Sequence, residues 1–198
     1  MANYCYTQYT IFGPYDICKK CLNKIQSWIL DDSQNDWSLY GISKKANIKL
    51  DNYKGEIDYI SKDVEENDEY SNFMIELQTA WIPRHDIIKL ILNKYFPDLE
   101  YRYLSLSEEP YNKIFESNDI NQDFYDVEYL ISSINDEYNY LNENICGYYT
   151  KNELEDLLFK DNITSEIFND SLDILKKMYK VNIQYIKYIS EGNNKIAN

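Results

Sequence analysis

Hydrophobic and polar side chains alternate along several runs in the first part of the chain, as they do in strands. The longest runs, at residues 4–12, 73–81 and 99–107, are rich in aromatic and β-branched side chains, which favour extended backbone. Shorter runs at residues 46–50 and 56–61 predict two further strands. The pattern therefore predicts a sheet in this part of the chain.

Two segments between these runs carry apolar residues three and four positions apart, which predicts amphipathic helices. The stripe of the first helix consists of Ile17, Cys18, Cys21, Leu22, Ile25, Trp28 and Ile29. The second helix follows Pro83, which suits a first turn, and its stripe consists of Ile87, Ile88, Ile91, Leu92, Tyr95 and Phe96. The order β-α-β and then β-α-β predicts an α+β fold, a ferredoxin-like split β-α-β sandwich with both helices on one face of an antiparallel sheet.

Five short segments of this region match motifs of a known family: Met1-Ala2-Asn3-Tyr4-Cys5, Ile11-Phe12-Gly13, Thr79-Ala80-Trp81-Ile82-Pro83, Phe96-Pro97-Asp98-Leu99 and Glu109-Pro110. Over about residues 1–118 the chain thereby resembles the YubB-type ferredoxin-like family of bacteriophages, prophages and conjugative plasmids. The resemblance implies a ferredoxin-like fold and an origin on a mobile element, and it brings no catalytic residue with it. The chain departs from the family at residues 111–115, which contain no glycine.

From residue 120 onward the apolar spacing changes to that of helices. A narrow seam with steps of three and four consists of Phe124, Val127, Ile131, Ile134, Tyr138 and Leu141. Thr150 and Glu153 have the spacing of a capping box, which predicts the start of a second helix. A third helix is expected over residues 164–179, and the alternation of Val181, Ile183 and Tyr185 predicts a closing strand.

The charge of the chain is unevenly distributed. The 198 residues carry a formal net charge of -14, and between Ile114 and Leu175 fifteen acids are accompanied by only two basic side chains, Lys151 and Lys160. Such a surface repels phosphate backbones and attracts basic grooves, so direct binding to nucleic acid is not expected. We therefore divide the chain into a ferredoxin-like domain at residues 1–118 and an acidic, mainly helical region at residues 119–198.

The charge pattern leads to a hypothesis for function: a non-enzymatic phage or mobile-element protein that mimics nucleic acid and blocks a basic groove on a host protein. An anti-CRISPR or anti-restriction role follows, with a CRISPR effector or a restriction enzyme as the partner. The expected contact residues are Asp123, Asp126, Glu128, Asp136, Glu137, Glu153, Glu155 and Asp156. The N-terminus lacks a signal peptide and no window is apolar enough to cross a bilayer, so we expect the cytosol of the host bacterium.

Two other functions remain open. A small molecule or nucleotide could bind, or react, at a pocket on the sheet around Trp81, His85 and Glu109, where His85 is the only histidine of the chain. Alternatively, the seam from Phe124 to Leu141 could mediate self-association. Cys18 and Cys21 have the spacing of half a zinc site, but within a helix they share one face, so we expect buried thiols and no metal or other cofactor.

Overall fold

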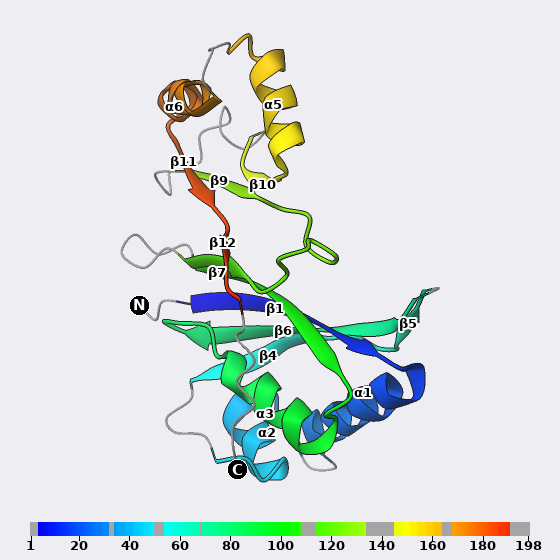
Figure 1. Ribbon diagram of the computed structural model, residues 1–198. Coiled ribbons are helices and arrows are strands. Elements are labelled where there is room, and N and C mark those ends of the chain that lie inside the picture. Colours follow the sequence, from blue (N-terminus) through cyan, green and yellow to red (C-terminus); the bar gives the residue numbers. More distant parts are fainter. Residues whose placement is uncertain are drawn as a thin grey trace. The chain divides into compact units, whose positions relative to one another are not determined.

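The computed structural model describes residues 4–31, 34–49, 54–67, 69–107, 114–133, 145–163 and 168–190 (Figure 1). The chain divides into two compact units, with the boundary between Asp119 and Ile120. Both units are mixed α+β structures, and each has a hydrophobic core of its own.

The sheet of the first unit has the strand order β8-β7-β1-β6-β4, and all neighbouring strands are antiparallel. Its strands are β1 (Tyr4–Gly13), β4 (Gly55–Ile60), β6 (Ser71–Ala80), β7 (Glu100–Ser107) and β8 (Ile114–Ser117), and the short β5 (Glu65–Glu66) also pairs with β6. A separate small hairpin consists of β2 (Leu30–Asp31) and β3 (Gln34–Asn35). The strands predicted at residues 4–12, 56–61, 73–81 and 99–107 are thereby confirmed.

Three helices cover one face of this sheet: α1 (Tyr15–Ile29), α2 (Leu39–Lys45) and α3 (His85–Tyr95) (Figure 1). The two predicted helices correspond to α1 and α3, and Leu22, Ile25, Ile87 and Ile91 of their apolar stripes are buried. Strand β6 alternates buried and partly exposed residues along its whole length, because one sheet face meets the helices. The core of the unit therefore lies between the sheet and the helices.

Helix α2 is missing from the sequence-based description, and the strand predicted at residues 46–50 is wrong over residues 46–49, where a turn follows this helix. Gly41 in the first turn lowers helix propensity and weakens the signal. The structure explains the glycine, since a Cβ there would lie 1.7 Å from an oxygen of the Asp36 carboxylate. The hydroxyl of Ser38 caps the helix by accepting a hydrogen bond from the Gly41 amide at 3.0 Å.

The second unit contains a small sheet in the order β10-β9-β11, with β9 (Tyr129–Ser133) in the centre between β10 (Gly147–Tyr149) and β11 (Val181–Tyr185). The other elements are α5 (Lys151–Lys160), α6 (Phe168–Tyr179) and the short strand β12 (Lys187–Tyr188). The core consists of Tyr129, Ile131, Ile145, Leu154, Leu158, Ile163, Leu172, Leu175 and Val181. The capping box and the closing strand are confirmed, as is the third helix within its described residues, 168–179.

The helix predicted along the seam is wrong over residues 124–133. Residues 124–128 are irregular and residues 129–133 form the central strand β9, while Ile134, Tyr138 and Leu141 lie outside the described residues. Tyr129, Leu130 and Ile131 are all buried, as expected for a short strand that is covered on both faces. A short, fully buried apolar segment can be a strand or a helix, and periodicity alone does not distinguish the two. The steps of three and four along the seam therefore predicted a helix where the chain forms a strand.

Candidate partner-binding surface and the histidine cluster

Helix α5 presents acidic side chains to solvent because its apolar stripe anchors it to the core of the second unit. Leu154 and Leu158 are buried, and the Thr150 hydroxyl caps the first turn by accepting a hydrogen bond from the Glu153 amide at 3.2 Å. The Glu153 carboxylate in return accepts a hydrogen bond from the Thr150 amide at 2.8 Å, which completes the capping box. With the stripe buried, Glu153, Glu155 and Asp156 are exposed on the remaining surface of the helix.

The other expected contact residues lie in different places. Asp123 and Asp126 are exposed and Glu128 is half-buried in the irregular segment before β9, whereas Asp136 and Glu137 lie outside the described residues. The Glu128 carboxylate accepts a hydrogen bond from the Lys151 amide at 3.3 Å, so it is adjacent to the first turn of α5. The structure thus brings Glu128 and the acids of α5 together at one end of this helix.

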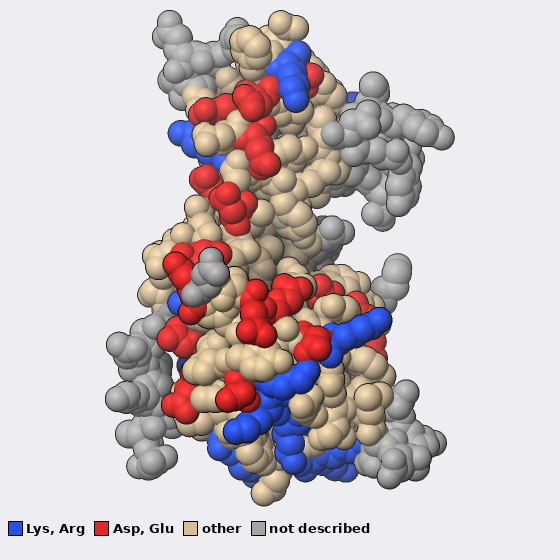
Figure 2. Space-filling model, turned by 90° about the vertical axis from the view of Figure 1, so that its right-hand side faces the viewer, with Lys and Arg blue, Asp and Glu red and all other residues tan. Residues whose placement is uncertain are grey.

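Lysines of the second unit moderate the acidic field. Lys151 lies 3.7 Å from Glu155 in an exposed pair one helical turn apart, a contact of little energetic weight in water. Lys176 lies 3.1 Å from Asp173 on α6, immediately after the acidic stretch that the sequence singles out. Figure 2 shows acidic side chains gathered along one face of this unit, with lysines at its borders. The surface is acidic, but some of its carboxylates pair with lysines, so its negative charge is less dominant than residues 114–175 of the sequence suggest.

Large apolar side chains accompany these acids, and sequence reasoning missed them. Phe159 is 79% exposed, three residues after Asp156 and four after Glu155, so it shares their face of α5. On α6, Ile174 and Met178 are also exposed and are spaced one turn apart. The sequence could have indicated this exposure, because Phe159 does not continue the three- and four-residue spacing of the buried Leu154 and Leu158. An exposed aromatic ring beside carboxylates is a typical feature of protein interfaces.

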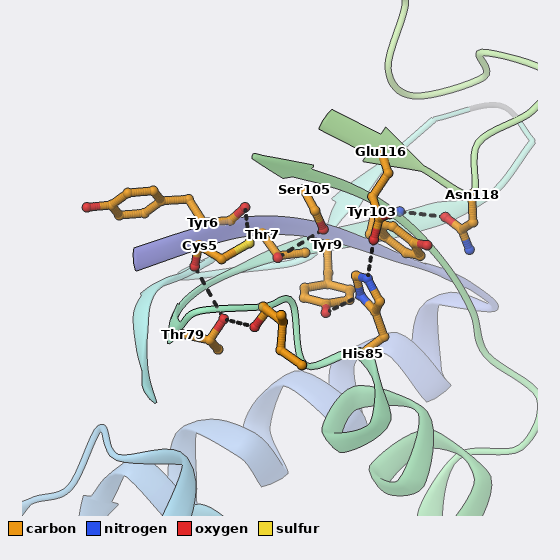
Figure 3. A network of polar contacts seen from close by, with 11 residues as sticks. Cys5, Tyr6, Thr7, Tyr9, Thr79, His85, Tyr103, Ser105, Glu116 and Asn118 are labelled. Atoms are coloured by element: carbon orange, nitrogen blue, oxygen red, sulfur yellow. Dashed lines mark hydrogen bonds and ion pairs between the residues drawn. The ribbon is translucent and has the colours of Figure 1, made fainter. Parts of the chain in front are cut away.

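The first unit contains a polar cluster around His85, between the first turn of α3 and the sheet (Figure 3). The hydroxyl of Tyr9 lies 2.7 Å from Nδ1 of His85, and Nε2 of His85 lies 3.4 Å from the Glu116 carboxylate. The imidazole also stacks on Tyr103, with ring centroids 3.8 Å apart. Both ring nitrogens are therefore engaged within the unit, and His85 links α3 to β1 and β8.

The protonation pattern of the cluster follows from its burial. Complete burial raises the pKa of the Tyr9 hydroxyl well above its usual range, so this group keeps its proton. The Tyr9 hydroxyl can therefore donate to Nδ1 of His85, while Nε2 faces the Glu116 carboxylate. Burial likewise raises the pKa of the neighbouring Asp86 carboxyl. Both ring nitrogens of His85 thereby have partners within the unit, and the Tyr9 hydroxyl is buried away from solvent.

Trp81, which connects β6 to this helix, has an unusual backbone conformation. Its φ angle is 75°, and the Ile82 amide donates to the Ala80 carbonyl at 3.0 Å, so the three residues form a γ-turn of the strained kind. The Thr79 hydroxyl donates a hydrogen bond to the Ile82 carbonyl at 2.8 Å, which stabilises the turn. The indole of Trp81 is 53% exposed. Glu109, the third residue expected there, lies outside the described residues.

The four cysteines of the chain are free thiols. Cys5, Cys18 and Cys21 are buried and Cys146 is exposed, so the buried thiols expected at Cys18 and Cys21 are confirmed. Within the described ranges, no group of three or more histidine, cysteine, aspartate and glutamate side chains could hold a metal ion. None of the described helices is long and apolar enough to span a membrane.

Comparison of the chain with protein-family models, with curated proteins and with solved structures finds no match. The residues of this chain and their arrangement are therefore the basis of the function proposed below.

Proposed function

We propose that this protein is a non-enzymatic inhibitor of phage or mobile-element origin that binds a basic, nucleic-acid-binding protein of the host. The observation that carries the proposal is the acidic surface of α5, where Glu155, Asp156 and the exposed Phe159 lie on one helical face. Glu153 and Asp156 are three residues apart, so their Cβ atoms are about 5–6 Å apart on the helix surface, a spacing that suits neighbouring Lys or Arg side chains of one groove. The protein thereby competes with nucleic acid for that groove.

The first unit serves as the scaffold in this proposal. Its strand order β7-β1-β6-β4, with antiparallel neighbours and with α1 and α3 as the connections on one face, supports a ferredoxin-like arrangement. A non-enzymatic role is supported by the His85 cluster, because the Tyr9 hydroxyl that contacts His85 is fully buried and has no access to an outside substrate. The class of partner that fits is a CRISPR effector or a restriction enzyme in the host cytosol.

The test compares two triple charge reversals in the full chain. Glu155→Lys and Asp156→Lys alter the acidic surface of α5, Asp126→Lys reverses a further expected contact residue before β9, and Glu153, which the capping box requires, is kept. Glu65→Lys, Glu66→Lys and Glu69→Lys change the net charge equally on exposed positions of the first unit. Binding is measured against purified CRISPR effectors and restriction enzymes, with duplex DNA as the competitor.

We expect the first triple variant to lose binding and the second to retain it, and duplex DNA to displace the wild-type protein. Binding should weaken roughly tenfold as salt rises from about 50 to 200 mM, because exposed charges are screened. Equal losses in both variants would show that only the net charge matters. Binding that is indifferent to salt and to DNA would remove the basis for nucleic-acid mimicry.

A second candidate function is a ligand site beside Trp81 and His85. The strained γ-turn at Trp81 favours it, because strained backbone concentrates at functional sites. Under this alternative, Trp81→Ala would abolish function while the acidic surface stays intact. Under the leading proposal, Trp81→Ala has no effect and the reversal on α5 is decisive.

A further inference from the structure

One face of the sheet in the first unit points away from the three helices and carries exposed tyrosines. Tyr4 and Tyr6 of β1 are 48% and 47% exposed, and Tyr59 of β4 is 43% exposed. Cys5 and Thr7 are buried on the helix side, so Tyr4 and Tyr6 point to the opposite side. A β-bulge between Ile57 and Tyr59 shifts the register of β4, so that Tyr59 pairs with Glu76 and faces this same opposite side. Figure 3 shows the Tyr6 ring directed away from Tyr9 and its cluster.

Carboxylates and amides lie between these rings. Tyr59 is directly opposite Glu76 of β6, and Glu56 is directly opposite Gln78. Gln78 is in turn opposite Tyr6, and its side-chain amide donates to the Tyr6 hydroxyl at 2.9 Å. Glu76 is therefore one cross-strand neighbour from Tyr59 and diagonal to Tyr6, within reach of a group bound over either ring. We call Tyr4, Tyr6, Glu56, Tyr59 and Glu76 the tyrosine–glutamate face.

Strands β1, β4 and β6, which form the tyrosine–glutamate face, contain neither lysine nor arginine. Within the described part of the chain, no lysine or arginine forms an ion pair with Glu56 or Glu76. Figure 2 shows lysine and arginine gathered instead over the helical side of this unit. The face thus combines negative charge with aromatic surface, which is complementary to a cation and repels phosphate.

The same side of the sheet already binds one guanidinium group of the chain. Arg102 of β7 is opposite Thr10, two residues from Phe12, and its guanidinium lies 5.1 Å from the centroid of the Phe12 ring. Its nitrogens lie 3.6 Å from the Glu100 carboxylate and 3.7 Å from that of Asp119. An aromatic ring beneath the guanidinium and carboxylates at its edge are the same elements that the tyrosine–glutamate face provides without a cation.

We infer that the tyrosine–glutamate face is a docking surface for an arginine-bearing segment of a protein partner. Arginine fits better than lysine because its planar guanidinium can stack on a tyrosine ring and hydrogen-bond a carboxylate in the same position. The inference rests on the proposed function in one respect, the basic character of the partner. The inference adds a second contact surface on the first unit, whereas the acidic surface of α5 belongs to the second unit.

The experiment uses the full chain and two short peptides that differ in one residue type. The first is a five-residue peptide with arginine at its second and fourth positions and glycine elsewhere, so that an extended backbone directs both guanidinium groups to one side. The second carries lysine at these positions. Binding is followed by shifts of backbone amide resonances in isotope-labelled protein, which report both the affinity and the location.

We expect the arginine peptide to bind more tightly than the lysine peptide and to shift amides of β1, β4 and β6. The double variant Tyr6→Leu, Tyr59→Leu removes two aromatic rings and keeps the charge of the face. It should weaken binding of the arginine peptide about five- to thirtyfold. Glu56→Gln with Glu76→Gln should also weaken it. The matched pair Glu65→Gln and Glu66→Gln on β5 changes the charge equally and should retain most of the affinity.

Three outcomes would overturn the inference: no binding of the arginine peptide, equal binding of the two peptides, or unchanged affinity in the tyrosine variant. Shifts confined to the second unit, abolished by the charge reversal on α5, would also overturn it. Loss of host-protein binding on reversing the α5 acids, with peptide binding intact, supports both surfaces. Peptide binding in a protein that shows no salt-sensitive partner would instead refute only the proposed function.

Discussion

The hydrogen bond between Tyr9 and His85 allows a quantitative prediction for the variant Tyr9→Phe. The Tyr9 side chain is fully buried, and its hydroxyl contacts Nδ1 of His85 at 2.7 Å. Removing the hydroxyl loses a net contribution of about 1 kcal/mol and leaves Nδ1 without its donor. Water can compensate only in part because the His85 side chain is 22% exposed. We therefore expect the free energy of unfolding of the first unit to fall by about 2 kcal/mol.

The measurement uses urea denaturation followed by tryptophan fluorescence. All three tryptophans, Trp28, Trp37 and Trp81, belong to the first unit, so their emission reports on this unit alone. The matched control is Tyr6→Phe on the same strand, whose exposed hydroxyl accepts from Gln78 and exchanges that bond for water. The control should cost less than about 0.5 kcal/mol. Equal costs for the two variants would refute the argument that the buried bond stabilises the unit.

Three further predictions concern other parts of the chain. Thr150→Ala breaks the capping box of α5 and should lower the stability of the second unit by about 1 kcal/mol, visible in far-ultraviolet circular dichroism, with the tryptophan transition unchanged. A thiol reagent near pH 8 should label only Cys146 rapidly in the folded protein, and rapid labelling of a second cysteine would contradict the burial of the other three. Burial raises the pKa of Cys5 to about 12 and that of Cys18 to about 11, from 9.0 for both. Because the unfolded thiols lose their protons first, the urea midpoint should fall as the pH rises above about 9, and a Cys5→Ala, Cys18→Ala double variant should fall less.

The periodicity of the sequence was sufficient for elements in which a single buried face dominates. Strand β6 alternates along its whole length and β1 over its first half, and α1 and α3 carry continuous apolar stripes, because one side of each meets the core. The cap of α5 was equally clear, since the Thr150 and Glu153 side chains bond to backbone amides within one turn. These interactions are local in the chain and therefore visible in its sequence.

Periodicity failed where non-local packing determines the structure. In strand β9 the consecutive residues Tyr129, Leu130 and Ile131 are all buried because both faces of the strand are covered, so it lacks the alternation that marks a half-exposed strand. Helix α2 has glycine at position 41 because the Asp36 carboxylate occupies the space where a side chain would lie. Neither the covering of β9 nor the approach of Asp36 to Gly41 can be read from local spacing in the sequence.

The sequence by itself determined the acidity of the chain, the amphipathic stripes of α1 and α3 and the four longest strands of the first unit, since these depend on composition and on near neighbours. Only the tertiary structure decided which groups meet. It paired His85 with Tyr9 and Glu116, left Phe159 exposed beside Glu155, and placed Tyr6, Tyr59 and Glu76 on one side of the sheet. The reason is that strand order and register bring together residues that lie far apart in the chain, and no local pattern encodes their pairing.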